Sequence, residues 1–500
     1  MLPSSPHPSP DLRIESPPRP AAPAAPPEEV HPLEQLLALL AGLNLCFLPW
    51  AFGGVDVWSQ LVSAGLAAGT LLTALLPRGG ERRPDSRPRL SRFPVFWAGL
   101  ALFAYVAIQA LNPAFEYKSE GTAWWLVRTD HIGWLPAGMT APFGDSNPWR
   151  SLLVWGSCWM TVCALWAGVT HRRTLLRLLT ALSVNGFAFA SFGIVQRASG
   201  TDRIYWSRSV GFPYFFAAII YKNHAVAFFI LLTAVTMGLT IRAFWQNRRQ
   251  RSRSSPAVMF LFFTFILILA IGLSFSISGL VLFAALLLTV APVAIRRYAT
   301  MFPRGKSRLP VLLTAGLLVV LAAGLGAAGS HGDLSYKIHV MMAGNATHSM
   351  KTRRLALRRG WQMFTDRWVT GWGAGCFEYG FTKYQHLEPE LTRLGGVPLR
   401  WEHVHNDWLE LLIELGVAGA LPVLFMLAYG GREIIRLRLW QKPALQPLLC
   451  GLGAVLVYGF CDFPLHNPAV AATAGALFPL LTRWGELENA AQAGRRNRPD

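Results

Sequence analysis

Long apolar runs separated by basic clusters constrain the fold of this chain more than any other feature. Each run has about 17 to 27 residues, and about 20 apolar residues are enough to cross the hydrocarbon core of a bilayer as a helix. The runs lie at residues 36–55, 57–77, 93–112, 149–170, 175–195, 217–241, 257–275, 277–295, 309–329, 405–431, 446–462 and 468–484. The sequence therefore predicts an all-α, polytopic integral membrane protein with about 12 transmembrane helices.

Composition and charge agree with this class. Hydrophobic residues make up 52% of the 500 residues and charged residues only 15%, a balance that is typical of membrane proteins. The net charge of +19 would suit nucleic-acid binding if it covered one surface, but the basic residues gather after the second, sixth, eighth and tenth runs. With a cytoplasmic N-terminus, all four clusters lie in the cytoplasm, as the positive-inside rule requires. We therefore expect both termini inside and residues 330–404 outside.

This topology divides the chain into five expected parts. A Pro-rich tail, residues 1–35, is too poor in large apolar side chains to form a core. Helices 1 to 9 follow in residues 36–329, a large outer loop in 330–404, helices 10 to 12 in 405–484 and a basic cytoplasmic tail in 485–500. The six cysteines show no paired spacing, so the sequence predicts neither a disulfide framework nor a zinc site built on cysteine.

Ionisable and polar groups crowd the start of the tenth helix. The run from His403 to Trp408 reads His-Val-His-Asn-Asp-Trp, and two glutamates follow at 410 and 414. Asn406, Glu410 and Glu414 are spaced i, i+4, i+8, so they form one polar stripe that should face protein or water and not lipid. Such groups are costly to bury in a membrane and usually mark function. The alternative is an interfacial helix start, in which the polar groups act as caps and anchors.

The expected outer loop carries an excess of positive charge that the positive-inside rule does not explain. Residues 330–404 contain ten Lys and Arg against six Asp and Glu. Arginine is suited to bidentate binding of phosphate oxygens. Arg354 and Arg358 are one helical turn apart, so one helix face can present several cations. For any single one of these residues, a solvated basic face is the simpler interpretation.

Several of these motifs resemble one known family. His405-Asn406, nine residues, Gly416, two residues and Gly419 are similar to the His-Asn-x9-Gly-x-x-Gly signature of the O-antigen ligase and O-antigen polymerase superfamily. Three further segments resemble motifs of the same family. They are residues 221–225 (Tyr-Lys-Asn-His-Ala), the run from Arg354 through Gly-x-Gly-x-Gly-x-Phe at 371–377, and residues 462–466 (Asp-Phe-Pro-Leu-His). These matches extend from about residue 210 to about residue 480, over half of the chain.

The resemblance implies a GT-C-like membrane glycosyltransferase. Such enzymes move a glycan from a polyprenyl-diphosphate carrier to an acceptor hydroxyl, with inversion and without a metal or another cofactor. They are multi-pass proteins of the bacterial inner membrane whose active site faces the periplasm, and their partners are the lipid-linked glycan donor, a glycan or lipid acceptor and the bilayer.

The resemblance also assigns roles to residues. His405 is expected to activate the acceptor hydroxyl, because an imidazole titrates near neutral pH, and Arg354 to bind the diphosphate. The expected substrate-binding residues are Lys222, Asn223, Arg203, Arg208, Asn406, Asp407 and Glu414. The family commonly has an arginine in the turn between helices 7 and 8, where this chain has Ile277. Either Lys222, Arg203 or Arg208 then supplies the missing charge, or the activity differs from that of other members of the family.

No metal site is predicted. The sequence contains no Asp-x-Asp and its outer acids are dispersed, whereas Mg²⁺ and Mn²⁺ prefer clustered carboxylates. His403, His405 and Asp407 carry zinc-ligand atoms, but their spacing is weak evidence for a site.

Two other functions remain open at this point. A transporter or flippase would use Glu410, Glu414 and Asp462 as proton-coupling groups near the membrane midplane. A structural or assembly subunit would tolerate loss of His405. Within the enzyme interpretation, ligase and polymerase are not separated, and the tryptophans of residues 113–148 would either stack on acceptor sugars or lie in the membrane interface.

Overall fold

The computed structural model confirms a mostly helical membrane protein. It describes residues 29–78, 86–121, 123–210, 215–250, 255–276, 279, 281–284, 348–394, 397–398 and 400–496. The helices of the main bundle are α1 (Pro32–Trp50), α2 (Val57–Leu75), α4 (Pro94–Leu111), α5 (Pro148–Gly168), α6 (Arg172–Ala198), α7 (Lys222–Gln250), α8 (Ala257–Leu273), α15 (Asp407–Arg436), α16 (Gln446–Tyr458) and α17 (Pro468–Arg496).

Seven of the described helices are long and apolar enough to cross a membrane. They are α1, α2, α4, α5, α6, α7 and α15, which correspond to the first six predicted spans and the tenth. Predicted spans 7 and 11 appear as the shorter apolar helices α8 and α16. Most of predicted span 8, all of span 9 and Ile277 lie outside the described residues, so the count of about 12 stays a prediction.

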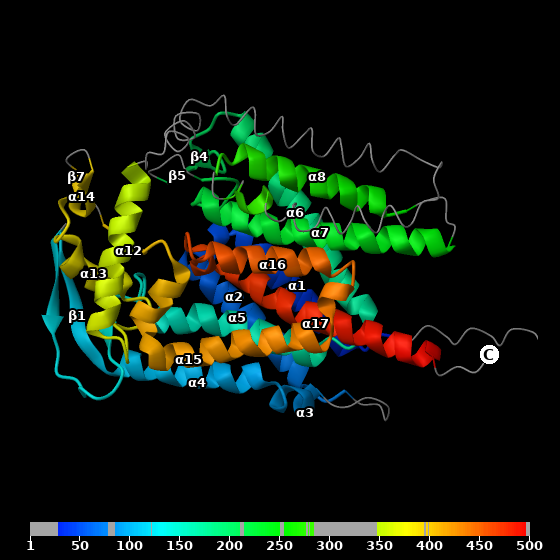
Figure 1. The fold of residues 1–500 in the computed structure, drawn as a ribbon, viewed down its shortest axis with the longest axis horizontal. Helices are drawn as coiled ribbons and strands as arrows, with labels where there is room; N and C mark the ends of the chain where they lie inside the picture. Colours follow the sequence, from blue (N-terminus) through cyan, green and yellow to red (C-terminus); the bar gives the residue numbers. More distant parts are fainter. Residues whose placement is uncertain are drawn as a thin grey trace, which may run out of the picture.

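The two ends of the bundle differ in chemistry. At one end, on the left of Figure 1, lie the strand β1 and helices α12 (His348–Asp366), α13 (Phe377–Gln385) and α14 (Pro389–Thr392); we call this the loop end. At the other, the basic end, lie the short helix α3 (Ser86–Ser91) and the C-terminal part of α17. Arginines gather there, among them Arg78, Arg89, Arg172, Arg436 and Arg483.

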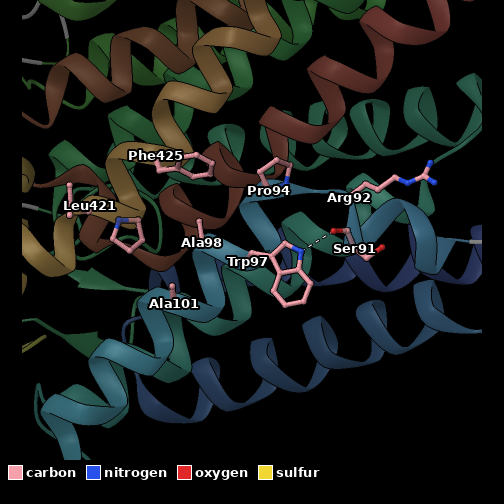
Figure 2. A pocket seen from close by; sticks show the side chains of 9 residues that line it. Ser91, Arg92, Pro94, Trp97, Ala98, Ala101, Leu421 and Phe425 are labelled. Atoms are coloured by element: carbon pink, nitrogen blue, oxygen red, sulfur yellow. Dashed lines mark hydrogen bonds between the residues drawn. The ribbon is translucent and has the colours of Figure 1, made fainter.

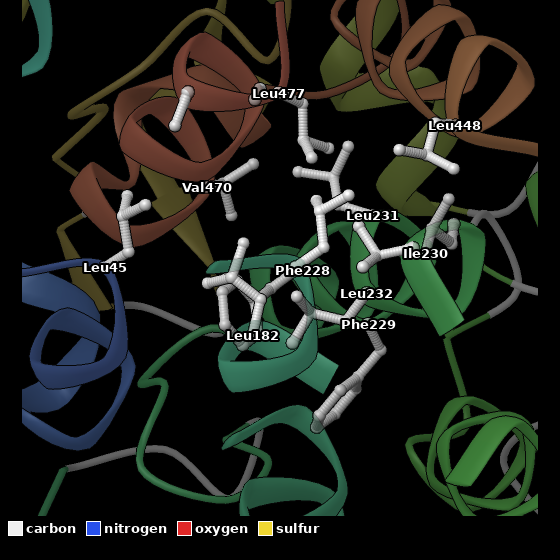
Figure 3. Packing of buried hydrophobic residues seen from close by; sticks show 14 of the residues in the cluster. Leu45, Leu182, Phe228, Phe229, Ile230, Leu231, Leu232, Leu448, Val470 and Leu477 are labelled. Atoms are coloured by element: carbon white, nitrogen blue, oxygen red, sulfur yellow. The ribbon is translucent and has the colours of Figure 1, made fainter. Parts of the chain in front are cut away.

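Helix α7 forms the centre of the bundle. Of its most apolar stretch, 89% is buried inside the protein, as expected for a helix that is hydrophobic all round. Phe228, Phe229 and the residues after them pack against Leu182 of α6, Leu448 of α16 and the start of α17 (Figure 3). Helices α8 and α16 flank α7, while α2 and α5 pack against each other and α4 packs against α15.

A second, smaller core lies at the loop end. A sheet of β1 (Pro113–Glu120), β2 (Ala123–Arg128) and β3 (Gly138–Thr140) has the order β2-β1-β3, with β2 antiparallel and β3 parallel to β1. The sheet packs on α12 and α13 through one apolar cluster, which includes Met139, Met363 and Tyr379. Two short strand pairs are β4 (Arg203–Ile204) with β5 (Arg208–Ser209) and β6 (Arg393–Leu394) with β7 (Val397–Pro398). The 3-10 turns are η1 (Phe52–Gly54), η2 (Leu439–Gln441) and η3 (Pro464–His466).

The bundle differs from the sequence prediction at its two termini and in the loop 113–148. Helix α1 begins at Pro32, inside the predicted tail, and residues 1–28 lie outside the described part. Helix α17 continues to Arg496 instead of ending near 484, because Lys442 donates to Gly485 O at 2.6 Å and to Asn489 Oδ1 at 2.7 Å. The small sheet was not predicted; its strands are short and their aromatic side chains obscure the alternation of period two.

Two backbone segments dock directly onto each other where the loop end meets α15. The N–H groups of Val417 and Ala418 donate to the carbonyls of Trp368 and Val369 at 2.8 and 3.1 Å, and the N–H of Gly373 donates to Glu414 O at 2.9 Å. Helix α15 is kinked there, because Gly416 has φ 62° and ψ −178°. A Cβ on Gly416 would lie 2.3 Å from Val369 O. Glycine is therefore required both by the backbone conformation and by the close approach.

We predict that Gly416→Ala destabilises the protein by at least about 1–3 kcal/mol, since its backbone conformation is nearly exclusive to glycine. The measurement is the thermal unfolding midpoint of the purified protein in detergent. The matched control is Gly431→Ala on the same helix, where an added Cβ meets nothing within 4 Å and alanine favours helix. Equal midpoints for the two variants would contradict the assigned role of the kink.

Candidate active site

The chain enters α15 through a residue in an uncommon conformation. His405 has φ 59°, in the left-handed region that costs a non-glycine residue on the order of 1 kcal/mol. Asn406 follows as the N-cap of α15, and its Oδ1 accepts the N–H of Leu409 at 2.9 Å. The amide of Asn406 also donates to Phe460 O at 3.0 Å. The first turn of α15 is thus fixed to the segment after α16, and His405 is held at their junction.

Asp462 is the partner of His405. Its carboxylate has no exposed surface, and its Oδ1 lies 3.1 Å from His405 Nδ1. The same Oδ1 accepts the N–H of Phe463 at 3.1 Å, while Oδ2 accepts Asn223 Nδ2 at 2.6 Å and Tyr458 Oη at 3.3 Å. A buried charge needs such partners, because its desolvation is otherwise too costly.

Arg353 brings positive charge to this carboxylate from α12. Its guanidinium Nη1 lies 3.8 Å from Asp462 Oδ2, and Nη2 donates to Tyr221 Oη at 3.1 Å. The side chain of Arg353 is 27% exposed and that of His405 is 21% exposed. A guanidinium has five N–H donors, so donors remain for a ligand. Both groups therefore reach an accessible surface while their partner Asp462 is fully buried.

The start of α7 completes the arrangement. Asn223 donates to Asp462 and to Tyr221 Oη at 2.7 Å, and its Oδ1 accepts Ser276 Oγ at 2.7 Å. Lys222 donates to Phe275 O at 3.1 Å. Tyr221 stacks on Phe463 with ring centroids 5.4 Å apart. The polar groups before α7 and after α16 thus form one continuous network.

The network sets the charge states of its members. Burial raises the pKa of Asp462, but the hydrogen bond from His405 and the positive charge of Arg353 outweigh it and bring that pKa to about 2. Burial lowers the pKa of His405 despite its bond to Asp462, so its neutral imidazole is favoured. Burial opposes the charge of Arg353, but Asp462 and Tyr221 more than compensate and raise its pKa. The site thus holds an anion, a neutral base and a permanent cation.

A second cluster of histidine and carboxylate side chains lies beside the Asp462 network. Asp407 accepts His466 Nδ1 at 2.6 Å and the N–H of Leu465 at 3.0 Å. Glu410 accepts His403 Nδ1 at 2.7 Å and the N–H of Val404 at 2.9 Å. These contacts tie η3 and the chain before His405 to the first turn of α15.

The structure brings together some of the predicted site residues but not all of them. His405 and Asn223 share the Asp462 network, and Lys222 adjoins it. Asn406 is the N-cap of α15, and Asp407 holds His466 and Leu465 as described above. Glu414 is buried, and its Oε1 accepts the N–H of Phe377 at 3.3 Å.

The predicted arginines lie elsewhere. Arg354 is exposed on α12, and Arg203 is exposed on β4. Arg208 makes a two-pronged ion pair with Asp56, at 2.6 and 3.1 Å, and its guanidinium lies 4.2 Å from the ring centre of Phe52. Arg353, the residue before the predicted Arg354, is the arginine that contacts Asp462.

Helical periodicity was the signal that distinguishes these two arginines. Arg353, Ala356, Gly360 and Met363 follow the spacing i, i+3, i+7, i+10, which places them on one face of α12. The last three of these residues are buried. Arg354 belongs to a different, exposed face. Counting the apolar stripe would therefore have chosen Arg353.

A groove elsewhere on the molecule has a different character. It has a volume of about 580 Å³ and lies between the first half of α4 and the middle of α15 (Figure 2), and His405 does not line it. Its lining residues are Ser91, Arg92, Pro94, Trp97, Ala98, Ala101, Leu421, Pro422 and Phe425. The lining is almost entirely apolar, so it suits contact with acyl chains and offers no general base.

The His405–Asp462–Arg353 network has the parts of a group-transfer site. With Nδ1 of His405 bound to the carboxylate, Nε2 is the nitrogen that can take a proton, and the carboxylate fixes the ring and its tautomer. Arg353 can stabilise an anionic leaving group such as a phosphate. We call these three residues the transfer site.

The comparisons with known proteins agree with this chemistry. Residues 260–424 match the family model described as O-antigen ligase. The matched segment includes Arg353, the glycines that dock on α15, and His405; Asn223 and Asp462 lie outside it. No curated protein matches the chain. Through the segment that carries Arg353 and His405, the chain is thus similar to the O-antigen ligase family.

Proposed function

We propose that this protein transfers a glycan from a polyprenyl-diphosphate carrier to an acceptor hydroxyl at the loop end of the bundle. The observation that carries this proposal is the partly exposed His405, held by the buried carboxylate of Asp462, with Arg353 on the other oxygen of the same carboxylate. A base and a phosphate-binding cation on one rigid support are what the transfer requires.

In the proposed step, the acceptor oxygen attacks the anomeric carbon and the bond from that carbon to the diphosphate oxygen breaks. His405 Nε2 takes the proton of the acceptor hydroxyl, and Asp462 stabilises the resulting imidazolium. Arg353 neutralises the negative charge that develops on the departing diphosphate, with Lys222 nearby. Attack opposite the leaving group inverts the anomeric centre. No divalent ion bridges the diphosphate in this proposal, because Arg353 provides the charge.

The positions of the acidic residues favour this proposal over a transporter. Glu410 and Glu414 lie in the first two turns of α15, and Asp462 precedes η3, so all three are at the loop end. Proton-coupling carboxylates of transporters lie near the midplane. Glu410 and Glu414 also accept hydrogen bonds from His403 and from the N–H of Phe377, which suits a structural role.

The acceptor is proposed to approach from the small sheet. Tyr117 and Trp124 lie with ring centroids 5.7 Å apart, Tyr117 and Tyr379 5.0 Å apart, and the guanidinium of Arg400 lies 5.6 Å from Trp124. The partly exposed rings of Tyr117 and Trp124 can stack on sugar rings, while the buried Tyr379 supports them from the core. A ligase and a polymerase share the donor chemistry above and differ only in what binds here.

We predict that His405→Ala lowers the transfer rate on the order of 10²–10⁴-fold, because the acceptor loses its base. Asp462→Asn should cause a loss of similar size, since the amide cannot hold the same tautomer or stabilise the imidazolium. The assay uses purified protein, a polyprenyl-diphosphate oligosaccharide and candidate acceptors, without added Mg²⁺ or Mn²⁺. His386→Ala, an exposed histidine after α13, is the control. Full activity of His405→Ala would exclude the proposed base.

The two neighbouring arginines of α12 give a second test. Arg353→Ala should lower the rate on the order of 10²–10³-fold through the loss of charge stabilisation, whereas Arg354→Ala should change it by less than about threefold, as for most exposed positions. Arg353→Lys keeps the charge but not the two-pronged geometry, so its rate should fall between wild type and Arg353→Ala. If Arg354→Ala is the inactive variant, the assignment of Arg353 is wrong.

The proposed topology places the loop end in the periplasm. In a background without the native cysteines, Met350→Cys on α12 should react with a membrane-impermeant maleimide in intact cells, since Met350 is 46% exposed. Arg438→Cys, exposed at the basic end, should react only after the membrane is permeabilised. The reverse pattern would place the transfer site in the cytoplasm.

A further inference from the structure

The second cluster contains three metal-binding side chains that converge on one point. His403 Nδ1 lies 2.7 Å and His466 Nε2 lies 3.2 Å from the same oxygen, Glu410 Oε1. One ligand atom from each of the three residues lies within 4.8 Å of the other two. A tetrahedral zinc ion, about 2.0–2.1 Å from each ligand atom, requires the ligand atoms to be about 3.3 Å apart. The three ligand atoms can thus reach the spacing that zinc requires if they move by about an ångström.

The groups behind these ligands are arranged as in known metal sites. Asp407 Oδ1 lies 2.6 Å from His466 Nδ1, which directs the other nitrogen of that ring toward Glu410. The second oxygen of Glu410 accepts the N–H of Val404 at 2.9 Å. A carboxylate that orients a histidine is the usual support of a metal ligand. Both carboxylates are nearly inaccessible, at 5% exposure for Asp407 and 1% for Glu410.

We propose that His403 Nδ1, His466 Nε2 and Glu410 bind one divalent transition-metal ion, and the two imidazoles with one carboxylate favour zinc. The side chains of His403 and His466 are 27% and 26% exposed, so an ion and a water ligand can reach the site from the loop end. The sequence predicted no metal site. It could not indicate this one, because the third ligand, His466, is more than fifty residues from Glu410 and only the fold brings the two together.

The ion has a positioning role in this proposal. It joins the chain before His405 to the first turn of α15 and to η3, the two segments that flank the His405–Asp462 contact. It takes no part in the transfer step, because His405 Nδ1 is committed to Asp462. The inference therefore does not rest on the proposed function, and the metal content of the protein tests it without any turnover.

The experiment is elemental analysis of the full-length protein, purified in detergent with a tag that contains no histidine from cells supplied with zinc. About one zinc per chain is expected. His403→Gln and His466→Gln should each lower the zinc content at least about tenfold, and Asp407→Asn should weaken zinc affinity by about 10–100-fold while the ligands remain. The control, His386→Gln, should keep the wild-type content.

Thermal unfolding gives a second readout that does not depend on any variant folding. Removal of zinc from the wild type by a strong chelator should lower the unfolding midpoint, and added zinc should restore it. Replacement by Co²⁺ should give the visible absorption of a tetrahedral ion in the wild type and in His386→Gln. A wild-type protein that carries no zinc, takes up no Co²⁺ and unfolds at the same temperature with and without chelator would overturn the proposal. Loss of zinc without loss of glycan transfer would remove only the positioning role.

Discussion

The buried carboxylate of Asp462 is the interaction on which the loop end depends. A charge with no exposed surface is stable only when hydrogen bonds and opposite charges replace the water it has lost. Its partners come from four separate parts of the chain, because Asn223 begins α7, Arg353 lies in α12, His405 precedes α15 and Tyr458 ends α16. One carboxylate therefore joins the membrane bundle to α12, and it places His405 and Arg353 on opposite oxygens.

Glycines make the other connection between these parts. Gly371 has φ 73°, and a Cβ there would lie 2.2 Å from Glu414 O, while a Cβ on Gly416 would lie 2.3 Å from Val369 O. The two backbones can approach only because neither residue has a side chain. Tyr105 adds hydrogen bonds from α4 to Leu415 O and Thr370 O, at 2.8 and 2.9 Å. The glycines of the family signature thus serve packing, and they hold α12 and α15 at the distance at which Arg353 meets Asp462.

The sequence was sufficient for the helical membrane class and for the position of most of the described helices, but not for the small sheet or for all of the contacts of the transfer site. Apolar runs are long and their composition is extreme, so six of the first seven predicted spans and the tenth reappear as long membrane helices. The sequence pointed to His405 because its motif is contiguous. It pointed to Arg354, whereas the proposal rests on Arg353, because motif matching does not distinguish neighbouring residues, although one residue along a helix turns a side chain by about 100°. Asp407 was expected to bind substrate, but its contact with His466 depends on a chain reversal that local sequence does not encode.

The left-handed conformation of His405 explains how two neighbouring clusters arise from one short motif. In an extended chain, residues i and i+2 point to the same side, so His403 and His405 would compete for one partner. The φ of 59° at His405 turns the chain, and the two rings instead reach different carboxylates, Glu410 and Asp462. Phe463 contacts both rings, with centroids 4.3 and 4.9 Å away. The strain at His405 is thus offset by two histidine–carboxylate contacts, His403 with Glu410 and His405 with Asp462, and it directs the two imidazoles to different clusters.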